Sequence, residues 1–245
     1  QKLISKNVPF MVSATIKQAL GSKHVNGAVI AKLSDGDTQE SGRTFSCDLI
    51  CVSAGLHPAA SLLHQAGGKF TYDRDLGTSI PTELGETVYA AGDVTGFHDL
   101  DISLLQGKVA GEKAAADLKG TGDRDSSIAF ELQKEEEQFR KKEVLPFSLT
   151  VPYTGKKKFV CFCEDVTEKD LVDAIYEGFE DIEILKRYST LSMGPCQGKM
   201  CLAAGIAICA RETGSGIQDI GTTTSRPPVQ PVPLGALAGS SHLPV

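Results

Sequence analysis

Two short cysteine motifs are the residues of this chain best suited to chemistry. Cys161 and Cys163 form a C-x-C pair, and Cys196 and Cys201 form a C-x4-C pair further along the chain. A four-coordinate metal centre requires two such pairs that the fold brings together, because each pair binds one side of the centre. Glycines flank Cys196 on both sides, so the backbone there can turn sharply and point its N–H groups at sulfur.

Three chemistries are compatible with these thiols: a [2Fe–2S] cluster, a structural zinc ion, and buried or disulfide-bonded cysteines. Zinc sites usually space their cysteine pairs as C-x2-4-C, and a C-x-C pair followed by a C-x4-C pair fits that pattern poorly. No secretory pattern is visible in the sequence, so we expect a cytoplasmic, reducing location, where disulfides are rare. The spacing therefore favours a cluster, with zinc as the second interpretation.

The composition is that of an ordinary globular chain. It has 245 residues, of which 41% are hydrophobic and 23% are charged, enough for one large or two modest domains. The net charge of -6 makes nucleic acid an unexpected partner. No apolar run is long enough to span a membrane, so no membrane span is expected. The chain opens at Gln1 in mid-pattern, which predicts a fragment that is truncated at its N-terminus.

The first part of the chain is rich in apolar and β-branched residues. Short β-rich runs cover residues 8–14 and 28–31. Cys47–Ser53 is nearly continuously apolar, which predicts a buried strand of a parallel sheet. Cys47 and Cys51 are then expected to be buried as small hydrophobic residues.

A second apolar run ends in a Gly-Asp pair. Residues 87–91 predict a strand that ends at Gly92 and Asp93, followed by a helix over residues 103–118. Ligands of open α/β sheets bind at the carboxyl ends of strands, where a carboxylate can accept hydrogen bonds from a ribose or ribityl hydroxyl. Gly55 follows the earlier strand and would let the backbone approach a ligand closely. A plain strand–turn–helix and a simple loop at Gly55 are the alternatives.

These two segments resemble a known flavoprotein superfamily. Val88–Asp93, together with Val52–Pro58, resembles the closing FAD segment of the pyridine nucleotide–disulfide reductase superfamily, whose members have two dinucleotide-binding domains. The resemblance implies that Asp93 contacts the flavin side chain, and that Gly55 and Gly92 line the dinucleotide. The G-x-G-x-x-G fingerprint that opens the fold in that superfamily does not occur in the 245 residues, so half of the dinucleotide site is missing.

The cysteine motifs lie in a segment with clear helix signals. Thr167 is a good N-cap with Asp170 at N3, and Gly178 is expected to end this helix. Lys199–Arg211 predicts an apolar helix beneath the cluster, with Cys209 buried inside it. The module resembles the bacterioferritin-associated-ferredoxin-like [2Fe–2S] domain, which implies that all four cysteines of the two motifs bind iron.

The order of the segments resembles one family in particular. A flavoprotein end, a C-x-C module and a proline-rich tail over Thr222–Gly239, which contains Arg226-Pro-Pro, resemble the α subunit of heterotetrameric sarcosine oxidase. Its relatives include the opine, proline and hydroxyproline dehydrogenases and hydrogen cyanide synthase. Leu185–Gly194 strengthens the resemblance. In this family the dinucleotide is FAD, or NAD in its place, and a flavin-containing β subunit oxidises the amine substrate.

We therefore expect an α/β chain. It would comprise the C-terminal part of a flavoprotein fold with two dinucleotide-binding domains, then a small helical [2Fe–2S] domain and an extended tail. The expected divisions are a partial FAD/NAD(P)-binding domain, a linker with a charged helix, the [2Fe–2S] domain and the tail, at residues 1–119, 120–155, 156–216 and 217–245.

The resemblance implies an electron-transferring subunit of a multi-subunit, FAD-dependent amine or amino-acid dehydrogenase, an oxidoreductase acting on CH–NH groups. Its partners would be the flavin-containing β subunit, which binds the small amine substrate, together with possible further small subunits. The alternatives are a zinc-stabilised scaffold and a fragment of a nitrite-reductase-like NAD(P)H reductase. No acid–base pair or nucleophile for substrate chemistry stands out in the sequence.

Overall fold

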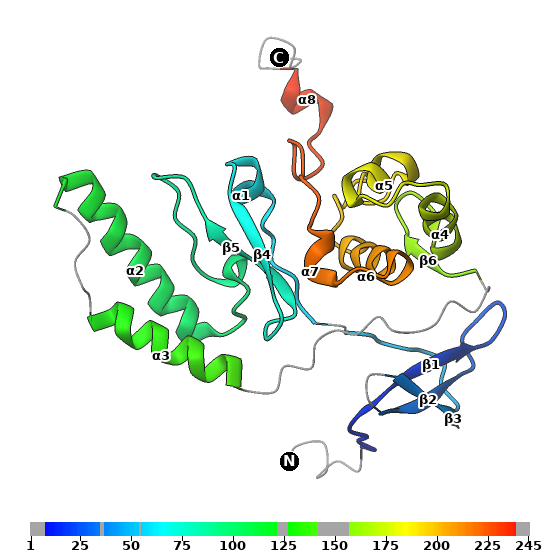
Figure 1. Cartoon of the computed structure of the whole chain (residues 1–245). Helices are drawn as coiled ribbons and strands as arrows, with labels where there is room; N and C mark the ends of the chain where they lie inside the picture. Colours follow the sequence, from blue (N-terminus) through cyan, green and yellow to red (C-terminus); the bar gives the residue numbers. More distant parts are fainter. Residues whose placement is uncertain (1–7, 35–36, 54, 122–126, 142–156, 239–245) are drawn as a thin grey trace. The chain divides into compact units, whose positions relative to one another are not determined.

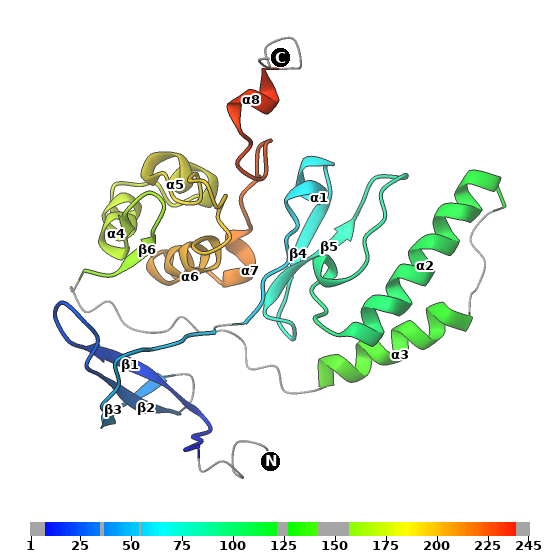
Figure 2. The ribbon, with the colours of Figure 1, turned by 180° about the vertical axis from the view of Figure 1, so that it is seen from behind.

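The computed structural model describes residues 8–34, 37–53, 55–121, 127–141 and 157–238 (Figures 1 and 2). They belong to two compact units. The first unit comprises Gln1–Gly55 with Ser148–Thr154, and the second comprises Leu56–Phe147 with Gly155–Val245. The cysteine motifs and the Gly-Asp pair both lie in the second unit.

The first unit contains a three-stranded antiparallel sheet in the order β1-β2-β3. Its strands are β1 (Ala14–Leu20), β2 (Gly27–Ser34) and β3 (Asp37–Phe45). Ala28 and Ala31 of the central strand are buried, as expected for an apolar strand between two others. The run predicted at residues 28–31 therefore lies within β2, whereas β1 begins only where the run at residues 8–14 ends.

Cys47–Ser53 does not form the predicted strand. The segment has no regular secondary structure, and the Leu49 and Val52 side chains are 71% and 73% exposed. Cys51 is also exposed and Cys47 is only partly buried, so the prediction that both are buried is wrong. A parallel strand of this kind is buried by neighbouring strands and covering helices. The part of the chain that the structure describes pairs no strand with this segment.

The second unit opens with a short helix, a hairpin and two longer helices. The elements are α1 (Ser61–Gln65), β4 (Lys69–Asp73), β5 (Thr78–Glu83), the 3-10 turn η2 (Asp93–Thr95), α2 (Leu100–Lys119) and α3 (Ser127–Lys141). Residues 87–91 form a loop, so the strand predicted there is wrong. The helix predicted over residues 103–118 is confirmed as α2. It starts earlier because Asp99 accepts hydrogen bonds from the N–H groups of Asp101 and Ile102.

Helices α2 and α3 lie side by side (Figures 1 and 2). Phe97 and Phe139 meet edge to face, with ring centroids 5.7 Å apart. The Gln106 side-chain amide donates a hydrogen bond of 2.8 Å to Glu136 on α3. Arg140 of α3 pairs with Asp73 of β4, which fixes the helix pair against the hairpin.

The cysteine motifs belong to a small, mainly helical module. Its elements are β6 (Phe159–Cys161), β7 (Val166–Thr167), α4 (Glu168–Tyr176), α5 (Ile182–Ser189), α6 (Leu202–Thr213), α7 (Ile217–Ile220) and α8 (Leu234–Leu237). The predicted N-cap is confirmed: Thr167 accepts from the Asp170 N–H, and the Asp170 carboxylate accepts from the Thr167 N–H. Within the described ranges, no helix has the length and apolar character needed to cross a membrane.

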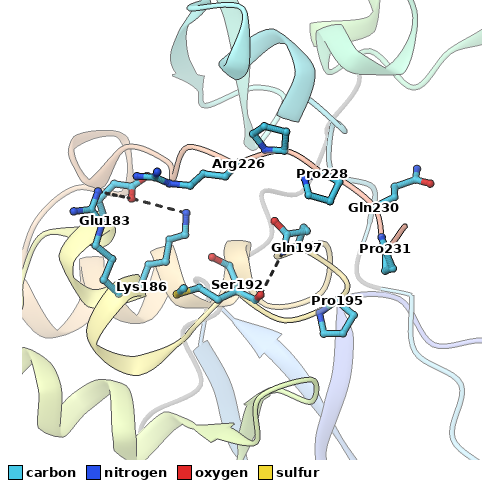
Figure 3. Close-up of a pocket in the computed structure, with 12 residues that line it drawn as sticks. Glu183, Lys186, Ser192, Pro195, Gln197, Arg226, Pro228, Gln230 and Pro231 are labelled. Atoms are coloured by element: carbon cyan, nitrogen blue, oxygen red, sulfur yellow. Dashed lines mark hydrogen bonds and ion pairs between the residues drawn. The ribbon is translucent and has the colours of Figure 1, made fainter. Parts of the chain in front are cut away.

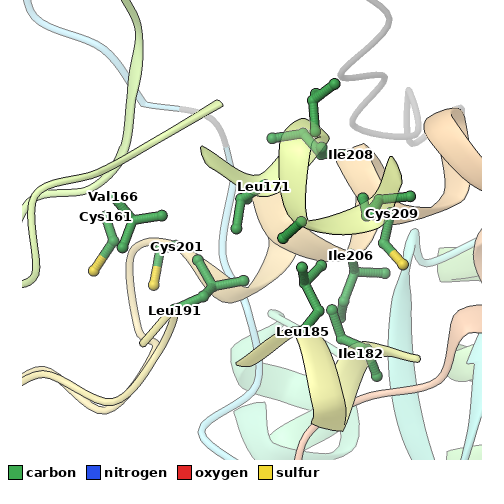
Figure 4. Close-up of a cluster of buried hydrophobic side chains, with 13 residues drawn as sticks. Cys161, Val166, Leu171, Ile182, Leu185, Leu191, Cys201, Ile206, Ile208 and Cys209 are labelled. Carbon is green, nitrogen blue, oxygen red and sulfur yellow. The ribbon is translucent and has the colours of Figure 1, made fainter. Parts of the chain in front are cut away.

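One hydrophobic cluster holds this module together (Figure 4). Leu171 of α4, Leu185 of α5 and Leu191 of the following loop are fully buried. Cys209 is buried within α6, as predicted, and its thiol lies 3.1 Å from the Glu180 carbonyl oxygen. The buried members are Cys161, Val166, Leu171, Val172, Ala174, Ile175, Ile182, Leu185, Leu191, Cys201, Ile206, Ile208 and Cys209. Two of the predicted ligands are therefore part of the core itself.

Candidate metal centre

The four cysteines of the two motifs lie on two loops that face each other. Cys161 is the last residue of β6, and Cys163 follows in the turn. Cys196 lies in the loop between α5 and α6, and Cys201 is the N-cap of α6. The thiols pair across the loops, Cys161 with Cys201 and Cys163 with Cys196. Figure 4 shows the sulfur atoms of Cys161 and Cys201 close together at one edge of the hydrophobic cluster.

Gly194 allows the two loops to come this close. A Cβ atom at Gly194 would lie 2.4 Å from the Cβ of Cys163 and 2.8 Å from a carboxylate oxygen of Glu164. Contacts this short do not occur between real side chains, so a larger residue would push the loops apart. Gly198 provides the second turn, with a φ of 81° that favours glycine.

The second cysteine loop is strained at several other positions. Thr190, Ser192 and Gln197 adopt the left-handed conformation, with φ values of 62°, 62° and 52°. Such residues persist only where the surrounding structure holds them, and they are concentrated at ligand sites and active sites. The strain lies in the same loop as Cys196.

Burial divides the four thiols into an inner and an outer pair. Cys161 and Cys201 are 1% and 0% exposed, so their sulfur atoms belong to the protein interior. Cys163 is exposed and Cys196 is partly buried. A group held by all four would have one side in the core and the other toward solvent.

The backbone favours a thiolate at Cys196. Burial alone would raise the pKa of Cys196, but N–H groups of Met200, Gly198 and Lys199 and the Cys163 thiol hydrogen-bond to its sulfur, and the pKa is lowered. The Cys196 N–H lowers the pKa of Cys163 in turn, but the Cys196 thiol, desolvation and nearby negative charge outweigh it and raise that pKa.

Cys201 shows the opposite behaviour. Desolvation and the neighbouring Cys161 raise the pKa of Cys201 to about 12, although the Ser192 N–H points at its sulfur. Burial of a thiolate without a counter-charge is unfavourable, so at neutral pH Cys201 is held as a thiol. Desolvation therefore outweighs the effect of the helix N-terminus at Cys201, the N-cap residue of α6.

No group of three or more His, Cys, Asp or Glu side chains is close enough to hold a metal ion among the residues that the structure describes. The thiols are brought together two by two across the loops, and not as a single tetrahedron. The donor set, four cysteines and N–H groups directed at sulfur, is nevertheless the type that binds an iron–sulfur cluster or zinc.

The predicted dinucleotide residues are less well placed. Gly55 and Gly92 have φ values of 100° and 81°, and nothing lies within 4 Å of a Cβ built on either. The Gly92 N–H donates to the Gln106 side-chain oxygen at 2.9 Å and is therefore not available to a ligand. The Asp93 side chain is 72% exposed and lies 3.7 Å from a ring nitrogen of His98. Gly92 and Asp93 lie close together only because they are consecutive in the sequence.

Comparison with known proteins gives a consistent result. Residues 155–240 match the family model described as the sarcosine oxidase A3 domain. The sarcosine oxidase α subunit of Corynebacterium sp. strain P-1 is 29% identical over 229 residues, which cover 92% of this chain and 23% of that protein. An opine oxidase subunit of Agrobacterium tumefaciens strain Ach5 is 29% identical over 92% of this chain and 46% of that protein.

A solved structure agrees with these relatives. The crystal structure of L-proline dehydrogenase from P. horikoshii superposes with a TM-score of 0.67 and 26% sequence identity. The similarity covers 91% of this chain and 44% of that structure. The chain is therefore similar to sarcosine oxidase α subunits and opine oxidase subunits over most of its length. Its fold is the mixed α/β arrangement of a flavoprotein dehydrogenase, as the sequence predicted. The chain spans less than half of the length of each of these proteins.

Sequence reasoning did not identify several residues that position the two cysteine loops. Glu168 is 4% exposed, and its carboxylate lies 2.8 Å from Arg211 of α6 and 3.2 Å from Lys158, just before β6. These contacts fix the strand that carries Cys161 against the helix that follows Cys201. Lys158 lies before β6 and Arg211 lies in α6, so neither belongs to the helix of Glu168. No pattern of neighbouring residues therefore indicated these ion pairs.

Proposed function

We propose that this chain is an electron-transferring subunit of a multi-subunit, FAD-dependent amine or amino-acid dehydrogenase. In this proposal Cys161, Cys163, Cys196 and Cys201 hold a [2Fe–2S] cluster. The observation that carries it is the pairing of the thiols across two loops, Cys161 with Cys201 and Cys163 with Cys196.

The close approach at Gly194 and the N–H groups directed at Cys196 support the same proposal. Hydrogen bonds to sulfur lower the energy of a thiolate, which is the form that binds iron. The inner pair would hold its side of the centre away from water, while the outer pair would face the surface. When bound, a [2Fe–2S] cluster supplies a one-electron carrier, and an exposed edge suits exchange of electrons with a partner.

The proposal assigns substrate oxidation to a partner. The relatives named above are called subunits of sarcosine oxidase and opine oxidase, and we propose that the partner of this chain too is a flavin-containing β subunit. The amine would bind to that partner, and this chain would accept the electrons. Asp93, Gly92 and Gly55 are proposed to line FAD, or NAD in its place, once the rest of the dinucleotide site is present.

Analysis of iron, inorganic sulfide and zinc tests the cluster directly. Protein reconstituted without oxygen is expected to carry two irons and two sulfides per chain and to absorb visible light. Cys163→Ser and Cys196→Ser should each remove that absorption. Cys51→Ser is the matched control, because Cys51 is exposed and lies in the first unit, and it should leave iron and sulfide unchanged.

Zinc is the competing occupant, because four thiolates also suit a structural zinc ion. Stoichiometric zinc without sulfide, in protein purified under reducing conditions, would contradict the cluster and favour the scaffold function. Zinc is colourless, so an absorption spectrum distinguishes the two in the same sample.

A further inference from the structure

The proline-rich tail closes one side of a cavity in the cysteine module. The cavity has a volume of about 390 Å³, within the range of small-molecule sites. Figure 3 shows Arg226 and Pro228 of the tail on one side, and Lys186 of α5 with Ser192 of the following loop on the other. The tail is held there by hydrogen bonds, including one of 2.7 Å from the Lys186 ammonium to the Thr224 carbonyl.

The wall of this cavity carries more positive than negative charge. Lys186, Arg187 and Arg226 line it, and Glu183 is the carboxylate among the lining residues. Glu183 lies 3.9 Å from both Lys186 and Arg187 and also accepts a hydrogen bond from the Thr224 N–H. The negative charge of Glu183 is therefore divided between Lys186, Arg187 and the Thr224 N–H. Among the described residues, Arg226 forms no ion pair.

The charges on Lys186, Arg187 and Arg226 repel one another. Burial lowers the pKa of Lys186, Glu183 raises it, and the charges of Arg226 and Arg187 lower it further. A bound anion would relieve this repulsion, and an Arg guanidinium is well suited to bind a carboxylate or phosphate through two hydrogen bonds.

A buried hydroxyl marks the floor of the cavity. Ser192 is 6% exposed and lines the cavity, and its Oγ has no hydrogen-bond partner among the described residues. A buried hydroxyl without a partner is unfavourable, so a ligand that accepts a hydrogen bond there would compensate it. Four prolines and Met193, together with Gln197 and Gln230, form the rest of the wall, and the apolar side chains among them suit an apolar part of the ligand.

We propose that this cavity binds a small organic oxyanion, with its carboxylate or phosphate group between Arg226 and Lys186 and a hydrogen bond from Ser192. The site is separate from the thiols, but it shares their loop, because Ser192 and Cys196 lie in the same segment between α5 and α6. The proposal does not depend on which metal the cysteines hold.

Isothermal titration of the full chain in an oxyanion-free buffer tests this proposal. Succinate probes a carboxylate ligand, and inorganic phosphate probes a phosphate-bearing ligand. We expect at least one of them to bind to saturation at one site per chain, and the tighter one identifies the ligand class. If neither saturates, the proposal is wrong.

Two variants locate the binding. Arg226→Gln should weaken the affinity for the bound probe at least tenfold, and Ser192→Ala should weaken it several-fold. Arg226 is exposed and forms no ion pair in the described chain, so its replacement should leave the thermal unfolding curve unchanged. Lys169→Gln removes a charge from α4 outside the cavity and should leave the affinity as it is. Unchanged affinity in a folded Arg226→Gln protein would overturn the proposal.

Discussion

Gly194 determines how closely the two cysteine loops can approach. A side chain at this position would overlap the Cβ of Cys163, and its φ lies outside the left-handed region, so the constraint is one of space and not of backbone conformation. The four cysteines likewise differ by their surroundings and not by their type. Cys196 has N–H groups directed at its sulfur, whereas Cys201 is enclosed by apolar residues.

Gly194→Ala should therefore separate the loops. If the proposed cluster is present, the variant should lose most of the iron and visible absorption, because a methyl group 2.4 Å from the Cys163 Cβ forces one loop to move. The module should also be destabilised by roughly 1–3 kcal/mol, measured by urea unfolding. Gly111→Ala is the control: nothing lies within 4 Å of that position on α2, and alanine there should stabilise the helix by up to about 1 kcal/mol. Full iron content in Gly194→Ala would show that the loops adjust.

The thiols should also differ in reactivity when the proposed centre is absent. The thiolate is the nucleophile, so at neutral pH Cys196, with its lowered pKa, should be alkylated by iodoacetamide first. Cys163 should follow more slowly because its pKa is raised. Cys201 and Cys209 should resist, since both are buried and their pKa values are raised to about 12 and about 11. Mass spectrometry of peptides after brief labelling gives the order. Equal labelling of Cys196 and Cys201 would contradict the burial described above.

At the scale of elements, features that depend on residues close in the sequence could be predicted, and features that depend on contacts between distant segments could not. The capping residues of α4 and the position of α2 depend on neighbours within a few residues, and both were predicted. Cys47–Ser53 and residues 87–91 were predicted as strands because their apolar pattern indicates burial. Such a pattern carries no information about the strands that must pair with it, and the described chain provides none. The spacing of the cysteines indicated two pairs, but their crosswise arrangement depends on how β6 and α6 pack.

Thr167→Ala tests the cap of α4. Thr167 is buried and bonded to Asp170, so its loss should reduce the free energy of unfolding by about 1 kcal/mol at neutral pH. The hydrogen bonds from Thr167 lower the pKa of Asp170 in the folded chain. Stability from a carboxyl with a lowered pKa is present above its unfolded pKa of about 3.9 and is lost as the pH falls through the folded value. The difference between the two proteins should therefore shrink below about pH 4, as measured by urea unfolding across pH. A constant difference would show that the carboxylate does not contribute.

At the scale of the whole molecule, the sites belong to different parts of the chain. The thiols and the anion cavity lie in the cysteine module, and all the residues that form them are present. The dinucleotide residues Gly92 and Asp93 lie on a loop before α2, without a glycine-rich phosphate loop in the sequence. The sarcosine-oxidase-α-like relatives extend well beyond the residues matched here. The cavity could not be predicted from the sequence, because it forms only where the tail meets α5.

Residues 1–245 alone are expected to bind FAD weakly or not at all. The phosphate-binding G-x-G-x-x-G loop is absent from them, and the Gly92 N–H is already bonded to Gln106. Isothermal titration with FAD, and with NAD in parallel, measures this. Tight binding of either would mean that the chain forms a dinucleotide site by another route.

The crosswise pairing of the thiols also has a mechanical consequence. With the proposed centre in place, Cys161 and Cys201 are cross-linked through it. A force applied to the two ends of the chain is then carried by this cross-link and not by the residues between the two cysteines. Stretching would extend the rest of the chain first, while α4, α5 and the loop before α6 would not contribute to the measured extension. Removal of the proposed centre would break the cross-link, so that about 40 further residues, or roughly 140 Å of extended chain, could be stretched. Pulling single molecules in optical tweezers, with and without a chelator, should show that length as a separate step.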